Sequence, residues 1–188
     1  MQSVSTITNP ILENWHVWVV TLALIVAAVI DGIKLKVPNW LTFPFIITGW
    51  VYSLSCLGWE GLGWSLLGTI AGLALLLPAY AIGGMGAGDV KLLAGVGAWM
   101  HVTDTFWGFS VATIIGAILA VLMVLYLKSW KKHASQFWTI AQEIMVIRDP
   151  NELSKIAADR KSSMLLLPYG IPIAIGCIVY FAWQGMLI

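Results

Sequence analysis

The sequence predicts an all-α integral membrane protein. Of its 188 residues, 60% are hydrophobic and only 10% are charged, whereas an ordinary soluble domain is about 25% charged. The mean hydropathy is +0.88, and eleven tryptophans suit a chain whose helix ends lie at membrane–water interfaces. Ten Lys and Arg against nine Asp and Glu leave no basic excess that would attract nucleic acid. We therefore expect a lipid bilayer, and no nucleic acid, as a partner.

Charged residues divide the chain into uncharged windows. About 20 apolar residues cross the hydrocarbon core of a bilayer, and five windows reach or approach that length. A sixth window, residues 92–103, is shorter. It can span the membrane only if its helix begins before Asp89 or if this part of the protein is in contact with water. The five longer windows are residues 14–30, 37–59, 61–88, 105–127 and 162–188.

The distribution of charge decides how the sixth window is interpreted. With six spans, all ten Lys and Arg fall on one side, and Glu13, Glu60 and Asp104 fall on the other. The positive-inside rule makes the basic side cytoplasmic and puts both termini on the non-cytoplasmic side. We therefore expect one polytopic domain over residues 1–188. Its six transmembrane helices are expected at about residues 14–33, 38–57, 62–83, 88–103, 106–127 and 164–186.

Residues 128–163 form the one sizeable segment outside the predicted spans, and they form a cytoplasmic loop in this topology. Within the loop, Phe137, Ile140, Ile144 and Ile147 recur at helical spacing. That pattern is typical of an amphipathic helix lying on the membrane interface. The loop is either a tether between the fifth and sixth helices or a segment that helps to receive a membrane-borne partner.

Asp31 and Asp89 lie at the cytoplasmic ends of two predicted helices. Placing an ionisable residue at membrane depth costs roughly 3 kcal/mol, so the presence of an aspartate at each of these two positions needs an explanation. Taken alone, Asp31 could mark the end of the first span, and Asp89 could cap the N-terminus of the fourth helix. Lys91, two residues after Asp89, should point away from that carboxylate on a helix. We therefore assign Lys91 to topology rather than to chemistry.

Four glycines, Gly83, Gly84, Gly86 and Gly88, precede Asp89 within a few residues. Each costs about 1 kcal/mol relative to alanine in a helix interior. The run therefore predicts irregular backbone, which at membrane depth must be buried in protein or line a wet cavity. Glycines also allow the backbone of an extended peptide to approach closely. Neither Gly-Lys-Ser nor Gly-Lys-Thr follows the run, which excludes a phosphate-binding loop.

Two aspartates that converge do not both ionise easily, so they share a proton. One can then activate a water molecule as a base while the other protonates the carbonyl of a peptide bond. Other chemistry has less support, because His16, His101 and His133 are scattered and no zinc or serine-hydrolase motif is present. We therefore expect an aspartic protease that needs neither a metal ion nor another cofactor.

Two further patterns are structural. Cys56 and Cys177 form no CxxC pair and lie in apolar stretches, so they support neither a disulfide framework nor a zinc site. Gly68 and Gly72 form a GxxxG pattern in the third predicted helix, which predicts close packing against another helix.

Two sequence blocks resemble the type IV prepilin peptidases, which are GxGD aspartic proteases of membranes. The first is Asp31 followed by Val-Pro-Asn at residues 37–39, and the second is Gly-Gly-Met-Gly-Ala-Gly-Asp-Val-Lys-Leu-Leu at residues 83–93. The resemblance covers roughly residues 27–99, with a weaker similarity at residues 168–172. It is strongest to the short form that serves tight-adherence (Flp) pilus systems.

The resemblance implies an enzyme of the bacterial plasma membrane that removes the basic leader from prepilins at the cytoplasmic face. The family's two catalytic aspartates correspond to Asp31 and Asp89. The long form carries a cytoplasmic insertion with paired cysteines and N-methyltransferase activity. Here Asp31 follows the first predicted span directly and no CxxC is present, so we do not expect methylation. The residues that shape the site would be Gly83, Gly84, Gly86, Gly88, Pro38 and Asn39.

Two other functions remain open on the sequence alone. The same two aspartates could bind a proton or cation in a small membrane carrier, or the chain could be a non-catalytic assembly subunit of a pilus or secretion machine. A carrier usually has repeated halves and a site near the midplane of the membrane. This sequence has no internal repeat, and both aspartates lie at one edge of the predicted bundle. These observations favour the peptidase.

Overall fold

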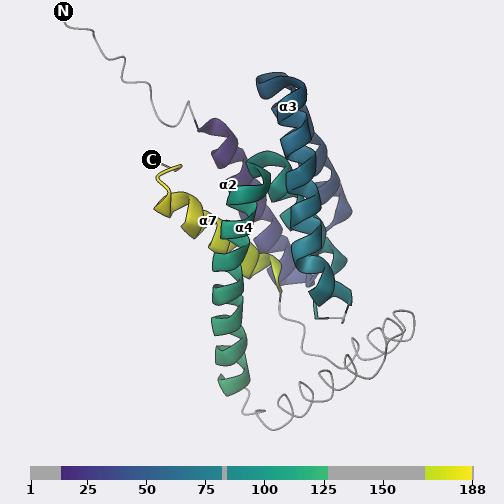
Figure 1. The fold of residues 1–188 in the computed structure, drawn as a ribbon. Helices are drawn as coiled ribbons and strands as arrows, with labels where there is room; N and C mark the ends of the chain where they lie inside the picture. Colours follow the sequence, from purple (N-terminus) through teal and green to yellow (C-terminus); the bar gives the residue numbers. More distant parts are fainter. Residues whose placement is uncertain (1–13, 82–83, 127–167, 188) are drawn as a thin grey trace, which may run out of the picture.

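The computed structural model describes residues 14–81, 84–126 and 168–187 (Figure 1). These residues form only α-helices and their connections: α2 (Trp15–Lys34), α3 (Asn39–Ala81), α4 (Ala87–Tyr126) and α7 (Gly170–Trp183). Three stretches, Trp15–Lys34, Asn39–Ala81 and Ala87–Met123, are long and apolar enough to cross a membrane, and α7 is a shorter apolar helix. The predicted all-α membrane class is confirmed at this level. The loop at residues 128–163, with its predicted amphipathic helix, lies outside the described residues.

Both long helices are broken at a single residue. Gly58 in α3 has φ 67° and ψ −157°, and His101 in α4 has φ 61° and ψ −169°. The sequence predicted short loops at these places, after residues 57 and 103, but in the structure one residue is enough to interrupt each helix. Glycine adopts positive φ at little cost, whereas a histidine there is uncommon. The predicted number of six membrane spans remains a prediction.

The two segments of α3 lie against each other. The indole Nε1 of Trp50, before the break, donates a 2.9 Å hydrogen bond to Oγ1 of Thr69, beyond it. Figure 1 shows the chain turning back at the end of the bundle where Gly58 lies within α3. This pairing makes α3 a helical hairpin, and its second segment returns toward the start of α4.

The first segment of α4 is the centre of the bundle. Leu92, Leu93, Ala94, Val96 and Ala98 are all fully buried, because α2, α3 and α7 pack against α4. A helix that is enclosed by protein on every side does not need the length or the apolar surface of a lipid-exposed span. This arrangement explains why the window at residues 92–103 is the shortest in the sequence.

Gly68 and Gly72 bring the second segment of α3 onto this central segment. A Cβ atom added at Gly68 would collide with the carbonyl oxygen of Gly97, and one at Gly72 would lie 2.5 Å from the carbonyl oxygen of Leu93. The backbones of the two helices therefore touch directly. The close packing predicted from the GxxxG pattern is confirmed.

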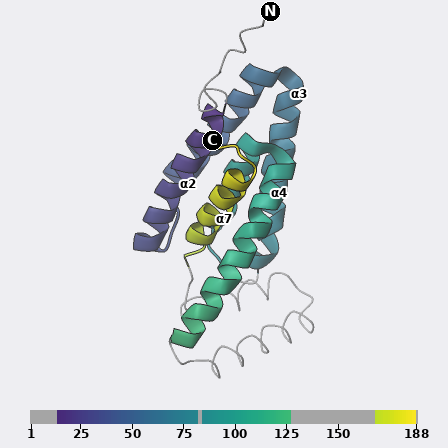
Figure 2. The same ribbon diagram turned by 90° about the vertical axis from the view of Figure 1, so that its left-hand side faces the viewer.

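The helix α7 runs between α2 and the second segment of α4 (Figures 1 and 2). Its start is tied to α2, because the N–H of Gly170 donates to the carboxylate of Asp31. Toward its end, the Tyr180 hydroxyl donates a 2.8 Å hydrogen bond to Oδ1 of Asp104 in α4. Asp31 and Asp104 therefore lie at opposite ends of the bundle, as the predicted topology requires.

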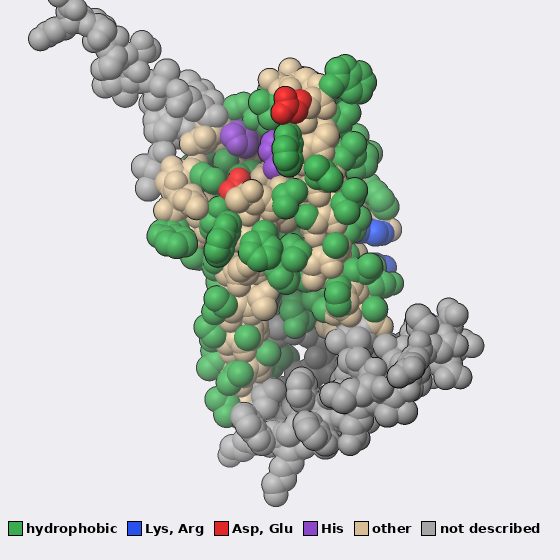
Figure 3. Space-filling model, in the orientation of Figure 1, with side chains coloured by type: hydrophobic (Ala, Val, Ile, Leu, Met, Phe, Trp, Pro, Cys, Tyr) green, Lys and Arg blue, Asp and Glu red, His purple; other side chains and the backbone are tan. Residues whose placement is uncertain are grey.

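The outer surface of the bundle is apolar. Leu22 and Val29 of α2, Ile70 of α3 and Ile114 of α4 are all more than half exposed. Apolar side chains cover most of the face shown in Figure 3, whereas the acidic and histidine side chains visible there lie toward one end. A continuous apolar surface of this extent is typical of a protein whose neighbour is lipid.

Candidate active site

Asp31 lies on the inward face of α2. The buried residues of that helix recur every three or four positions, and Asp31 is the last of them, with 2% of its surface exposed. Its Oδ2 accepts a 2.8 Å hydrogen bond from the N–H of Gly170. Gly170 is the first residue of α7, so this N–H is one of the donors that a helix start leaves without an intrahelical partner. The bond lowers the cost of burying the carboxyl group.

Asp89 lies in the first turn of α4 and is 5% exposed. Its Oδ2 accepts a 3.1 Å hydrogen bond from the N–H of Gly86, and its own N–H donates to the carbonyl oxygen of Gly86 at 3.2 Å. This reciprocal pair resembles a capping box, in which a side chain in the first turn binds the backbone just before the helix. Asp89 therefore both caps α4 and presents a carboxyl group to the space beside it.

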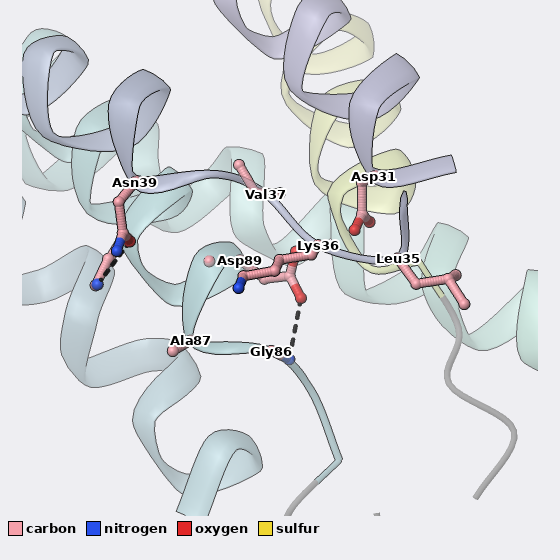
Figure 4. Close-up of a pocket in the computed structure, with 10 residues that line it drawn as sticks. Asp31, Leu35, Lys36, Val37, Asn39, Gly86, Ala87 and Asp89 are labelled. Carbon is pink, nitrogen blue, oxygen red and sulfur yellow. Dashed lines mark hydrogen bonds between the residues drawn. The ribbon is translucent and has the colours of Figure 1, made fainter. Parts of the chain in front are cut away.

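The two aspartates line one cavity of about 420 Å³ (Figure 4). Pockets that bind small ligands have volumes of about 300–1,000 Å³, so this cavity has room for water together with a small ligand or a short stretch of peptide. Asp31 comes from the end of α2 and Asp89 from the start of α4, and the segment joining α2 to α3 also lines the cavity (Figure 4). The remaining lining residues are Leu35, Lys36, Val37, Asn39, Gly86, Ala87, Gly88 and Lys91.

Gly88 allows the segment joining α2 to α3 to pack directly on the start of α4. A Cβ atom added at Gly88 would lie 2.5 Å from the carbonyl oxygen of Val37 and 3.0 Å from its Cβ. At Gly86 an added Cβ would lie 3.3 Å from Oδ2 of Asp89. The glycine run therefore brings backbone close to the aspartate, as its composition predicted. Gly84 is exposed, and Gly83 lies outside the described residues.

Of the two neighbouring residues Pro38 and Asn39, only Asn39 lines the cavity. Pro38 immediately precedes α3, and its carbonyl oxygen accepts the N–H of Leu41 at 3.1 Å. Pro38 thus starts the helix and does not line the cavity. Asn39 lines the cavity, and its Oδ1 accepts a 2.9 Å hydrogen bond from Nζ of Lys91.

The expectation that Lys91 points away from Asp89 agrees with its contacts, which are with Asn39 and Phe43; its place on the cavity wall was not expected. Lys91 lines the cavity, and its Nζ lies 4.7 Å from the centre of the Phe43 ring as well as binding Asn39. The helix does direct this side chain toward α3, but the first turn of α3 is itself a wall of the cavity. Lys36, which the sequence analysis counted only for its charge, is a second lysine on the cavity wall.

His101, which the sequence analysis set aside as a catalytic or metal-binding candidate, does not line the cavity. His101 contacts Ser53 near the break in α4, with 3.4 Å between His101 Nε2 and Ser53 Oγ, and Asp104 binds Tyr180 at the end of the bundle remote from Asp31. In the part of the chain that the structure describes, no group of three or more His, Cys, Asp or Glu side chains could hold a metal ion.

A comparison with protein families gives a match to the type IV leader peptidase family over residues 18–121. The chain belongs to this family. The matched region contains both Asp31 and Asp89, together with the glycine run. It ends in the second segment of α4, before the first residue of α7.

Several curated proteins that are similar to this chain carry the name prepilin leader peptidase/N-methyltransferase. The protein of Neisseria gonorrhoeae is 33% identical over 112 residues, which are 56% of this chain and 39% of the relative. The protein of Aeromonas hydrophila is 30% identical over 112 residues, 56% of this chain and 38% of the relative. The match therefore spans about two fifths of the length of these relatives. No solved structure matches the chain significantly.

Gly170 is the site residue that the sequence analysis missed. Its contribution is a backbone N–H, which any residue other than proline carries, so no side-chain pattern indicates it. The available signal was the weaker similarity to the family at residues 168–172, which was not connected to either aspartate. In the structure a Cβ atom added at Gly170 would lie 2.9 Å from Oδ2 of Asp31, so this glycine is required by close approach.

Proposed function

We propose that this chain is an aspartic endopeptidase of the bacterial plasma membrane that removes the basic leader from type IV pilin-like precursors. The observation that carries the proposal is that Asp31 and Asp89, buried residues of two different helices, line the same cavity. Membership of the type IV leader peptidase family supports it, and so do the names of the curated relatives. Those names also include methyl transfer, but the proposal for this chain concerns cleavage alone.

The reaction needs one ionised and one protonated carboxyl group. The ionised aspartate takes a proton from a water molecule in the cavity, and the resulting oxygen attacks the scissile carbonyl carbon while the protonated aspartate gives its proton to the carbonyl oxygen. Collapse of the tetrahedral intermediate breaks the C–N bond and returns a proton to the leaving amine. Backbone N–H groups hold Oδ2 of Asp31 and Oδ2 of Asp89, which fixes the orientation of both groups before substrate binds.

The basic residues support a site at the cytoplasmic face. Lys34 ends α2, and Lys36 and Lys91 line the cavity itself, so the described cations all lie at the end of the bundle that holds the aspartates. Under the positive-inside rule this end is cytoplasmic. With six spans, both termini are on the other side. A prepilin would then leave its basic leader in the cytoplasm and insert its hydrophobic helix beside the enzyme.

The direct test is cleavage of a purified prepilin by the detergent-solubilised chain, with both products identified by mass spectrometry. We expect one cut, between the basic leader and the hydrophobic segment, and the resemblance in sequence favours a prepilin of the tight-adherence (Flp) type. A carrier or an assembly subunit would produce no cut under the same conditions. Absence of cleavage of a prepilin from the same genome would count against the proposal.

A further inference from the structure

A second hollow lies beside the aspartates and has a different character. It is a groove of about 230 Å³ between the second segment of α3, the second segment of α4 and the start of α7. Among the residues that the structure describes, no charged one lines it. α3 contributes Leu75, Leu76 and Ala79 to its lining, and α4 contributes Gly116, Ala117 and Ala120 among others.

The groove is lined in part by the two backbone segments that hold the aspartates. Met85 lines the groove, and the next residue, Gly86, donates its N–H to Asp89. Tyr169 lines the groove as well, and the next residue, Gly170, donates its N–H to Asp31. The same two turns of backbone therefore contribute one residue each to the groove and one backbone N–H each to an aspartate that lines the cavity. A chain that lay in the groove would reach the aspartates by passing over these turns.

The walls of the groove run along the bundle. α7 and the second segment of α4 are antiparallel, since Gly116 faces Pro172 near the start of α7 and Ala112 faces Gly176 one turn further along. In both views of the ribbon these helices lie side by side (Figures 1 and 2). Ala117 is exposed on the rim, so the groove is open on the outer face of the bundle, where lipid would lie. Its volume accommodates the side chains of one helix face rather than a whole helix.

We propose that this groove receives the apolar helix of the substrate immediately after the bond to be cut. The inference rests on the proposed function, because it assumes a prepilin whose basic leader precedes an apolar segment. The charges match this division of the substrate: an uncharged groove suits the apolar helix, whereas the polar cavity beside it takes the extended peptide around the scissile bond. Docking of an apolar helix face in an apolar groove is a recurrent mode of recognition. Held in this way, the helix would fix which peptide bond lies between the aspartates.

The proposal can be tested by measuring KM for variants in which a larger side chain occupies part of the groove. Ala117→Leu places a larger side chain on its rim, and Ala74→Leu makes the same change at an exposed position of α3 that does not line the groove. For a full-length prepilin in vesicles, we expect Ala117→Leu to raise KM about tenfold, equivalent to about 1.4 kcal/mol, with Ala74→Leu at the wild-type value. The rise in KM should be confined to substrates with the apolar helix. Equal KM values for the two variants would overturn the proposal.

Photo-crosslinking tests the occupant without relying on activity. A benzoylphenylalanine is placed at Ala120 in the Asp89→Asn variant, and at Ala74 as a control, and each is irradiated in vesicles with an uncleaved prepilin. We expect an adduct from position 120 alone, joined to the first turns of the prepilin's apolar segment. Adducts only to phospholipid, or only to residues 127–167 of the chain itself, would show another occupant and overturn the proposal.

The two proposals fail in different ways. If the proposed function is wrong, the unmodified chain cuts no prepilin. If only the docking inference is wrong, the unmodified chain cuts prepilins, Ala117→Leu behaves like Ala74→Leu, and position 120 gives no adduct with the substrate.

Discussion

The N–H of Gly170 donates a 2.8 Å hydrogen bond to Oδ2 of Asp31, across most of the length of the chain. The bond joins the start of α7 to the end of α2, and α7 is in turn held to α4 by the bond from Tyr180 to Asp104. Asp31 is therefore oriented by a helix that lies outside the region matched by the family. In the proposed mechanism Asp31 shares a proton with Asp89, and such a pair needs this kind of fixed orientation.

We expect Gly170→Ala to lower kcat by at least about tenfold. An added Cβ would lie 2.9 Å from Oδ2 and 3.0 Å from Cβ of Asp31, so the carboxyl group must rotate or move, and misplacement of a reacting group by about 1 Å can cost about 100-fold. KM for the prepilin should change less than kcat, because Gly170 is not among the residues that line the groove proposed for the substrate helix. The measurement is steady-state cleavage in detergent or vesicles.

Gly63→Ala is the matched control for this glycine. Gly63 is an exposed residue of α3 with no atom within 4 Å of an added Cβ, so the substitution should leave kcat at the wild-type value. If Gly170→Ala retained the wild-type kcat, Asp31 would not depend on the start of α7.

Asp31→Asn and Asp89→Asn should each abolish cleavage while both variants still insert into the membrane. An amide can neither accept a proton from water nor donate one as a carboxylic acid does, and loss of an acid–base group costs roughly 10²–10⁴-fold in rate. The measurement is prepilin processing in cells together with the amount of each variant in the membrane fraction. Because the proposed mechanism uses no metal, we expect a chelator to leave the wild-type rate unchanged.

Asp104→Asn is the control for the two aspartate variants. Asp104 lies at the other end of the bundle and accepts the Tyr180 hydroxyl through Oδ1, and an asparagine Oδ1 accepts the same bond. Processing by this variant should be close to wild type. Substantial cleavage by either Asp31→Asn or Asp89→Asn would remove the proposed mechanism.

Gly88→Ala should lower both the stability of the folded protein and the rate at which it cleaves a prepilin. The added methyl group would press on the backbone of Val37, and overpacking of this kind costs about 1–3 kcal/mol. Because Val37 and Gly88 both line the cavity, relief of the clash would separate its two walls. Thermal unfolding in detergent and cleavage should therefore both be impaired, and a variant with wild-type melting temperature and rate would contradict the close approach.

The sequence predicted those parts of this fold that composition and local spacing determine. The helices follow from uncharged apolar windows, and the contact of Gly68 and Gly72 with α4 follows from a local pattern. The single-residue breaks were not predicted, because His101 adopts a positive φ that its residue type disfavours. Here tertiary packing outweighs the local preference.

The same limit applies to the site. Asp31 and Asp89 were identified because a buried charge is costly enough to stand out in an apolar sequence. Gly170 acts through its backbone, and Lys91 reaches the cavity because the first turn of α3 forms one of its walls. Both depend on which helices become neighbours. The spacing of residues along one helix does not indicate which other helices will pack against it.

The proximity of Asp31 and Asp89 can be tested in the membrane by cross-linking. In a chain with Cys56→Ser and Cys177→Ser, cysteines are introduced at positions 31 and 89, and a short bifunctional thiol reagent is added. A direct disulfide requires Cα atoms within about 7 Å, which is stricter than two side chains facing one cavity, so the reagent relaxes that limit. Because both positions line the same cavity, we expect efficient linkage within one chain, read out by mass spectrometry of the linked peptides.

Positions 31 and 104 provide the control pair for the cross-link. Gly170 at the start of α7 binds Asp31, and Tyr180 near its end binds Asp104, so the length of α7 separates the two positions and the short reagent should not join them. A reagent for single thiols shows whether each cysteine is reachable. If cysteines 31 and 89 both react with that reagent but are never linked to each other, the two aspartates do not share a site in the membrane. They would then be separate residues at helix ends, and a mechanism that divides one proton between them would have no structural basis.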